Sequence, residues 1–259
     1  MADKIRISRR QNYKEQLRLY LNLTKRLNAK LKKLFRQASR KASTKYAQGM
    51  FVDDIFMTEY ADDLYKILAN QYRTVITQSA KRITQQRYKK ADDEVNTIIE
   101  AYIITHTATE VTRITETTKK LLSATILKGI RDGDSIEDIS KSIRKSNAFS
   151  ENRATLIART ETHTAMNAGN QAITKTLALS EPVKEWNSAL DERSRTWHKT
   201  MDSKKPIPID EAFIVNTPTK YGNIPYRMMY TGDSNGGAAN VCNCRCFTSY
   251  YDKDDEIIS

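Results

Sequence analysis

The positions of proline and glycine constrain the fold of this chain more than any other feature of its sequence. All five prolines of the 259 residues lie at or after Pro182, and residues 1–128 contain a single glycine, Gly49. Proline removes a backbone donor and clashes with the preceding helical turn. A long proline-free stretch rich in Leu, Ala, Lys, Arg, Gln and Glu favours helix. We therefore predict helices up to residue 180 and short strands and loops after it.

The first predicted helix carries an apolar seam along one side. Uncharged residues recur with alternating spacings of four and three, at Tyr13, Leu17, Tyr20, Thr24, Leu27, Leu31, Leu34 and Ala38. This heptad spacing is typical of a helix that packs against another helix. We expect the helix to end between residues 43 and 53, with Gly49 as the pivot.

Further helices and short strands complete a mainly helical α+β fold. The predicted helices span 54–86, 91–128 and 136–145 (N-cap Asp134 or Ser135), and another follows Ser150 as its cap. The predicted strands span 213–216, 226–230 and 245–251, with a turn at 216–218. The domains follow as a basic helical arm (1–50), a helical domain completing a bundle (51–180) and a small mixed α/β module (181–259).

Composition excludes several classes of protein. With 39% hydrophobic residues the chain can pack a core, so full disorder is excluded. The first eleven residues lack the apolar segment of a secretory signal, and no apolar run approaches the roughly 20 residues of a membrane span. All three cysteines lie within 242–246, which does not allow a disulfide framework. We expect a chain made in a reducing cytoplasm and without a membrane span.

Charge is concentrated at the N-terminus. Residues 1–50 hold fifteen Lys and Arg against two acids, a net charge of +13, whereas the whole chain carries +12. So many unpaired cations repel one another unless an anion is near, and DNA phosphate releases counterions on binding them. The candidates for non-specific contact with double-stranded DNA are Arg9, Arg10, Arg18, Lys25, Arg26, Lys30, Lys32, Lys33, Arg36 and Arg40. A solvated helix face, an acidic protein surface and an anionic membrane remain alternatives.

A second candidate site joins His198 to Cys244 and Cys246, whose side chains are ligands that zinc accepts. In an extended strand, residues two apart lie roughly 6–7 Å apart. Two sulfurs bound to one zinc must be nearer about 4 Å apart. The strand would have to bend, so we favour buried thiols without a cofactor and keep zinc as the alternative.

Two further clusters admit both a chemical and a structural interpretation. The run Arg159-Thr-Glu-Thr-His163 could supply a catalytic Glu/His pair or a structural Arg–Glu ion pair. The run from Asp191 to His198 could bind phosphate, act as an acid/base site or form a salt-bridged turn. The glycine-rich segment 232–237 lacks the phosphate-loop pattern, and we interpret it as a mobile loop.

Read in order, the C-terminal pieces resemble the phage Mu F-like minor head protein family (phage head morphogenesis proteins). The matching pieces are Ser135-Ile-Glu-Asp-Ile139, Ala158-Arg-Thr-Glu161, Lys184-Glu-Trp186, Asp191-x-Arg193-x-Arg195-x-x-His198, Pro208-Ile-Asp-Glu-Ala-Phe213 and Asn243-Cys-Arg-Cys246. The resemblance implies structural roles for Arg159, Glu161, Trp186, Asp191, Arg193, Arg195, His198, Phe213, Asn243 and Arg245. Cys242 is an addition to the usual Asn-Cys-Arg-Cys ending.

The resemblance implies a minor capsid protein of a tailed phage or prophage without enzymatic activity. Such a protein joins the prohead near the portal, stays inside the capsid of the virion and contacts packaged DNA, after assembly in the host cytoplasm. Its partners would be the portal and the capsid or scaffold proteins. Two alternatives remain. One is a metal-dependent enzyme, a nuclease or a wall-modifying activity, that uses His198 with Cys244 and Cys246. The other is a toxin-like transferase, although the chain ends thirteen residues after Cys246.

Overall fold

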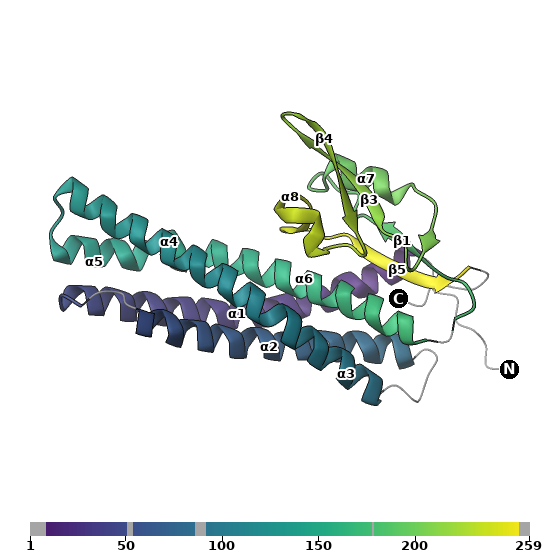
Figure 1. The fold of residues 1–259 in the computed structure, drawn as a ribbon, viewed down its shortest axis with the longest axis horizontal. Coiled ribbons are helices and arrows are strands. Elements are labelled where there is room, and N and C mark those ends of the chain that lie inside the picture. The colour runs from purple at the N-terminus through teal and green to yellow at the C-terminus, as the bar shows by residue number, and fades with distance from the viewer. Residues whose placement is uncertain (1–8, 51–53, 86–91, 178, 254–259) are drawn as a thin grey trace. The chain divides into compact units, whose positions relative to one another are not determined.

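The computed structural model describes residues 9–50, 54–85, 92–177 and 179–253. Its elements in chain order are α1 (Arg9–Ala47), α2 (Asp54–Gln85), α3 (Asp92–Tyr102), the π-helical segment η1 (Ile103–Thr107), α4 (Ala108–Asp132), α5 (Ile136–Lys145), the 3₁₀ turn η2 (Asn147–Phe149), α6 (Glu151–Thr176), β1 (Pro182–Asn187), α7 (Thr196–Asp202), β2 (Ile207–Pro208), β3 (Phe213–Thr219), β4 (Gly222–Met228), the 3₁₀ turn η3 (Ser234–Gly236), α8 (Gly237–Val241) and β5 (Phe247–Asp252). Long helices thus precede short strands, which confirms the predicted mainly helical α+β fold (Figure 1).

The predicted seam of the first helix is confirmed in α1. The seam residues from Tyr20 to Ala38 are buried, and Tyr13 and Leu17 are half-buried. The helix ends at Ala47, inside the predicted interval, and Gly49 has a φ of +72°. The Gly49 and Met50 amides close the last turn by donating to the carbonyls of Tyr46 and Lys45, at 3.0 and 2.9 Å. Such a left-handed position after a helix favours glycine.

Helix α2 matches its prediction, but the single helix predicted over 91–128 is wrong. It is divided into α3 and α4 by η1, and α4 continues to Asp132. A π-helical segment adds a residue to the turn, which sequence periodicity does not reveal. Ser135 is the N-cap of α5, since its hydroxyl accepts from the Asp138 amide at 3.1 Å. Ser150 caps α6 in the same way through the Arg153 amide, at 3.2 Å.

The chain forms two compact units, each built from separate stretches of sequence. The helical unit comprises the described residues within 25–71 and 101–158, and the mixed unit those within 1–24, 72–100 and 159–259. The core of the helical unit includes the packed rings of Phe35, Tyr60 and Phe149. The core of the mixed unit gathers Trp186, Met201, Phe213, Val215, Met228, Val241, Cys244 and Cys246. The division at residues 50 and 180 remains a prediction.

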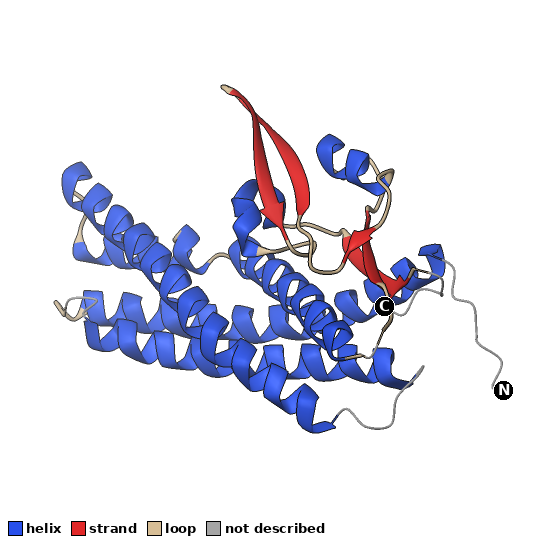
Figure 2. Ribbon diagram, turned by 45° about the vertical axis from the view of Figure 1, so that its right-hand side comes forward, coloured by secondary structure: helices blue, strands red, loops and turns tan. Residues whose placement is uncertain are grey.

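The strands of the mixed unit form two antiparallel sheets (Figures 1 and 2). One sheet has the order β2-β1-β5, and the other is the β3-β4 hairpin. The turn predicted at 216–218 is wrong, because these residues belong to β3 and Pro218 pairs with Asn223 of β4. Each strand of a two-stranded sheet has a free edge, where proline is tolerated. The predicted third strand begins two residues late, at Phe247, and neither β1 nor β2 was predicted.

No described helix combines the length and the apolar character that crossing a membrane requires.

Candidate functional site

The imidazole of His198 and the thiols of Cys244 and Cys246 meet in the core of the mixed unit. His198 lies on α7, and both cysteines lie between α8 and β5. The His198 Nδ1 atom is 3.6 Å from the Cys244 sulfur and 3.5 Å from the Cys246 sulfur. All three ligand atoms lie within 4.8 Å of one another, and the three residues are only 1–3% exposed. The three candidate metal ligands named from the sequence are therefore brought together.

The cysteines lie outside the strand in which the sequence placed them. The chain bends at Asn243, which has a φ of +55°, and β5 begins only at Phe247. The Cys246 amide lies 3.5 Å from the Cys244 sulfur, so the segment folds back on itself. The spacing of an extended strand therefore does not apply, because this bend turns both sulfurs toward His198.

Asn240 of α8 orients the histidine from the opposite side. Its Oδ1 atom accepts from the Trp197 indole at 2.8 Å and lies 3.1 Å from His198 Nε2. Its Nδ2 atom donates to Thr217 Oγ1 and to the Gly236 carbonyl, each at 2.8 Å. Because Nε2 meets an oxygen acceptor, it carries the proton, which leaves the Nδ1 lone pair facing the sulfurs. Asn240 was not predicted from the sequence, since no motif marks the Gly-Gly-Ala-Ala-Asn run.

The two thiols have opposite acidities. The pKa of Cys244 is well below its usual value because of a hydrogen bond with Cys246, reinforced by the nearby His163 and His198. Burial raises the pKa of Cys246 well above its usual value, and its contact with Cys244 raises it further. Of the two thiols, Cys244 is therefore the more acidic.

The segment 191–198 forms an ion-paired turn beside this cluster. The Arg245 guanidinium donates to both Asp191 carboxylate oxygens, at 2.5 and 2.7 Å. This bond is the main reason that the pKa of Asp191 falls to about 2. Arg195 donates to the Cys242 carbonyl at 2.7 Å, whereas Arg193 and Asn243 are exposed. A carboxylate so paired is a weak base, and the arrangement matches the salt-bridged turn among the three interpretations.

Glu161 and His163 face different partners. The Glu161 carboxylate accepts from the Tyr72 hydroxyl, and His163 Nε2 meets the Cys246 carbonyl. The half-buried Arg159 lies at the start of the same run. The segment 232–237, expected to be a mobile loop, forms the 3₁₀ turn η3 with Asp233 as its cap. Its Gly232 packs against the His163 ring, so this turn belongs to the folded core.

Six of the ten predicted DNA contacts form one exposed face of α1 in the helical unit. They are Lys25, Arg26, Lys30, Lys33, Arg36 and Arg40, and none forms an ion pair with a described residue. At 100° per residue they lie within about 140° of the helix circumference, opposite the buried seam, and extend along about 22 Å of its axis. The seventh, Lys32, is half-buried and forms an ion pair with Glu151 at 2.6 Å.

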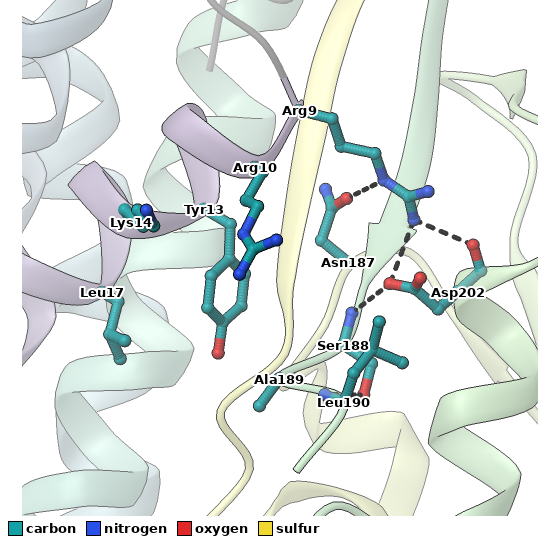
Figure 3. Close-up of a pocket in the computed structure, with 10 residues that line it drawn as sticks. All are labelled: Arg9, Arg10, Tyr13, Lys14, Leu17, Asn187, Ser188, Ala189, Leu190 and Asp202. Atoms are coloured by element: carbon teal, nitrogen blue, oxygen red, sulfur yellow. Dashed lines mark hydrogen bonds and ion pairs between the residues drawn. The ribbon is translucent and has the colours of Figure 1, made fainter.

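The remaining three predicted contacts lie on α1 in the mixed unit. Arg10 and Arg18 are exposed. Arg9 forms ion pairs with Glu185 and Asp202, both at 3.0 Å, and donates to the Trp186 carbonyl at 2.8 Å. Figure 3 shows its guanidinium turned toward Asn187 and Asp202 at a surface pocket of about 650 Å³. Arg9 is therefore occupied in holding the start of α1 to the module.

Comparison with known proteins identifies the family to which this module belongs. The model of the Phage Mu protein F like family matches residues 119–249, just over half of the chain. The chain belongs to this family of phage proteins, as its motifs indicated. The matched region includes the His198 cluster, the Asp191–Arg245 pair and the segment from Arg159 to His163.

A curated relative is the minor head protein GP7 of the Bacillus phage SPP1. The two chains are 31% identical over 133 residues, which is half of this chain but 39% of the relative. The chain therefore spans well under half the length of that relative. No solved structure matches the chain.

Proposed function

We propose that this chain is a minor head protein of a tailed phage or prophage, built into the virion during head morphogenesis. Its membership in the Phage Mu protein F like family carries this proposal. The minor head protein GP7 supports it, because its similarity to this chain covers 133 residues.

We further propose that the chain enters the prohead near the portal and stays inside the capsid. Its partners there would be portal, capsid or scaffold proteins. The test is co-expression of the full chain with the portal protein encoded by the same phage, followed by affinity purification of the tagged portal ring. Retention of the chain by the ring at moderate salt is the expected result. Recovery of the chain with assembled shells but not with the portal would replace the portal by the shell as its partner.

The exposed cationic face of α1 is the surface that we propose for DNA. Its six side chains present only positive charge, and no described acid pairs with them. Contacts of this kind neutralise phosphates without reading bases, so binding should be indifferent to sequence and weaken steeply with salt. This property suits DNA packed inside a capsid, where any sequence must be accepted.

A matched pair of charge variants of the full chain tests this surface. The first carries Arg26→Gln, Lys30→Gln, Lys33→Gln and Arg36→Gln on the α1 face. The control removes four exposed cations elsewhere in the helical unit, through Lys120→Gln, Arg131→Gln, Arg144→Gln and Lys145→Gln. Duplex binding is measured against salt concentration. The α1 variant should lower the slope of log affinity against log salt by about 3 to 4, and the control by much less. Equal losses in the two variants would show that net charge alone attracts the DNA.

No observation favours the metal-dependent enzyme. His198, Cys244 and Cys246 are 1–3% exposed, so a metal that they held would not meet a nucleic-acid or cell-wall substrate. The transferase alternative likewise has no site among the described residues that would support it.

A further inference from the structure

We propose that His198, Cys244 and Cys246 bind a zinc ion that holds α7 to the bend before β5. The inference is independent of the head-protein function, since it rests on the geometry of the buried cluster alone.

The arrangement of the three donors is the first argument. Two sulfurs and one imidazole nitrogen lie within 4.8 Å of one another. Donors around a tetrahedral zinc are separated by about 3.5–4 Å, given bond lengths of about 2.0–2.3 Å. The contacts of 3.5 and 3.6 Å between His198 Nδ1 and the sulfurs already have this separation. An ion therefore fits with small movements of side chains that the core already holds together.

The orientation of the histidine is the second argument. Metal-bound histidines nearly always donate their other N–H to an oxygen acceptor, which fixes the ring and its tautomer. Asn240 Oδ1 takes this place at 3.1 Å from His198 Nε2. Asn240 is itself held by Trp197, Thr217 and Gly236. A fully buried amide with four polar contacts is more support than a histidine needs for packing alone.

The groups around the sulfurs are the third argument. The Cys246 amide faces the Cys244 sulfur at 3.5 Å, and Trp186 packs in the same core cluster as both cysteines. The Trp186 indole N–H has no oxygen or nitrogen acceptor among the described residues, although it is buried. The Cys246 amide and the unpartnered Trp186 indole N–H thus lie in the core that holds two sulfurs, which would be negative when bound to metal. Zinc with two thiolates is neutral overall, and a neutral site costs less to bury than a charged one.

The site would be structural. On binding, each thiol gives its proton to solvent and its sulfur bonds to zinc. A water molecule would fill the fourth position, because no fourth histidine, cysteine or carboxylate of the described residues joins the cluster. The ion would join segments more than forty residues apart in sequence.

Metal analysis of the full chain, purified without chelators and with a non-thiol reductant, is the test. Elemental analysis should find one zinc per chain. Cobalt added to the metal-free chain should give the ligand-field bands of a tetrahedral ion and a sulfur-to-cobalt charge-transfer band. Far-ultraviolet circular dichroism of the metal-free chain verifies that it stays folded for the titration.

The third cysteine provides a matched control. Cys242 is half-buried and lies outside the cluster, so Cys242→Ser should keep the full zinc content and the cobalt spectrum. Cys244→Ser and Cys246→Ser should lose the charge-transfer intensity, and His198→Gln should shift the ligand-field bands. Asn240→Ala keeps all three ligands and should weaken zinc binding by about 10–100-fold.

Two results would overturn the proposal. One is a folded, reduced wild-type chain that contains no zinc and takes up neither zinc nor cobalt. The other is loss of zinc in Cys242→Ser together with its retention in Cys244→Ser, which would mean that other ligands hold the metal. A disulfide between Cys244 and Cys246 in the isolated chain, with no metal uptake after reduction, leads to the first result.

Discussion

The helical unit packs aromatic rings in its core, whereas the mixed unit adds a long buried stretch of polar helix to its apolar core. In the helical unit, the rings of Phe35, Tyr60 and Phe149 pack edge to face or tilted, with Arg153 over Phe35. In the mixed unit, about three turns of α6, residues 161–171, are buried although many of these residues are polar. Hydrogen bonds to specific partners hold these side chains, such as Asn167 between Thr231 and the Thr248 amide.

This difference separates two ways of specifying a fold. Apolar packing tolerates substitutions of similar size, because dispersion and burial are not directional. A buried polar network tolerates few, because each lost partner leaves a group unsatisfied at a cost of about 1–3 kcal/mol. The family match begins in α4 and covers most of the polar network. The following predictions test this contrast.

Truncation of the aromatic core should produce the largest loss. Phe35→Ala removes a ring that is 1% exposed and should destabilise the helical unit by about 3–5 kcal/mol. Urea unfolding combined with hydrogen exchange of residues 25–71 measures the loss. Leu127→Ala in the same unit removes a side chain that is 57% exposed and should cost less than about 0.5 kcal/mol. If Phe35→Leu costs as much as Phe35→Ala, this core is more specific than we infer.

Two glycines with similar backbones should respond differently to alanine. Gly49 has a φ of +72° and open space around it, whereas Gly232 has a φ of +83° and a Cβ there would lie 2.5 Å from His163 Nδ1. Gly49→Ala should therefore cost about 1–2 kcal/mol for the left-handed backbone alone. Gly232→Ala adds about 1–3 kcal/mol of overpacking, because hydrogen bonding holds the His163 ring. Equal free energies of unfolding for the two variants would show that the His163 ring moves to make room for the added methyl group.

Lys184 should make the stability of the mixed unit depend on alkaline pH. Its ammonium is buried and donates to the Ile209 and Met229 carbonyls, at 2.8 and 2.6 Å. Burial lowers its pKa from 10.5 to about 8. The penalty for burying the charge is fully present below pH 8 and is relieved as the pH rises from about 8 to 10.5, where the unfolded chain binds more protons.

Between pH 7.5 and 9.5, the free energy of unfolding of the wild type should therefore rise by about 2 kcal/mol relative to that of Lys184→Met. Unfolding titrations of both proteins at the two pH values measure this difference, and the subtraction removes groups common to both. If the unfolding free energy of the wild type instead fell relative to that of Lys184→Met as the pH rose, the predicted direction of the pH dependence would be wrong.

The surface ion pair should matter least. Asp191→Asn removes a bidentate contact with Arg245, but the carboxylate is 42% exposed, so we expect a loss below about 1 kcal/mol. Because the pKa of Asp191 falls to about 2, its contribution is present above pH 3.8 and is lost as the pH falls through about 2. The free energies of unfolding of wild type and Asp191→Asn, measured from pH 6 down to pH 2, should therefore converge. A loss above 2 kcal/mol would place this pair among the core interactions.

Local sequence signals predicted the long helices well. The seam of α1, the caps Ser135 and Ser150, and the parts of β3 and β4 at 213–216 and 226–228 follow from local sequence patterns and capping chemistry. The η1 segment and the two-residue strand β2 did not, because neither leaves a periodic pattern. In β1, the buried Lys184 breaks the usual alternation of apolar and polar residues.

The candidate site could be predicted only in part. The chemistry of their side chains marked His198, Cys244 and Cys246 as candidate metal ligands. The residue spacing of an extended strand, however, predicted that the two sulfurs lie too far apart to share one ion. The left-handed backbone of Asn243 bends the chain, so the spacing of an extended strand does not apply. Nothing in the sequence distinguishes this residue from an ordinary asparagine in a turn. Asn240 acts on the site through a contact with His198 that only tertiary structure creates.

The first helix also depends on the last strand. Asn12 and Gln16 donate to Ser249 and Thr248 of β5, at 2.9 and 3.4 Å, and the Tyr13 and Tyr20 rings pack on Phe247. On the ribosome, the start of α1 therefore emerges more than 200 residues before its partner strand. The helical unit can close once residue 158 has emerged, while the mixed unit must wait for nearly the whole chain. Translation that stops before β5 would release a chain in which Asn12 and Gln16 of α1 lack their partners Ser249 and Thr248.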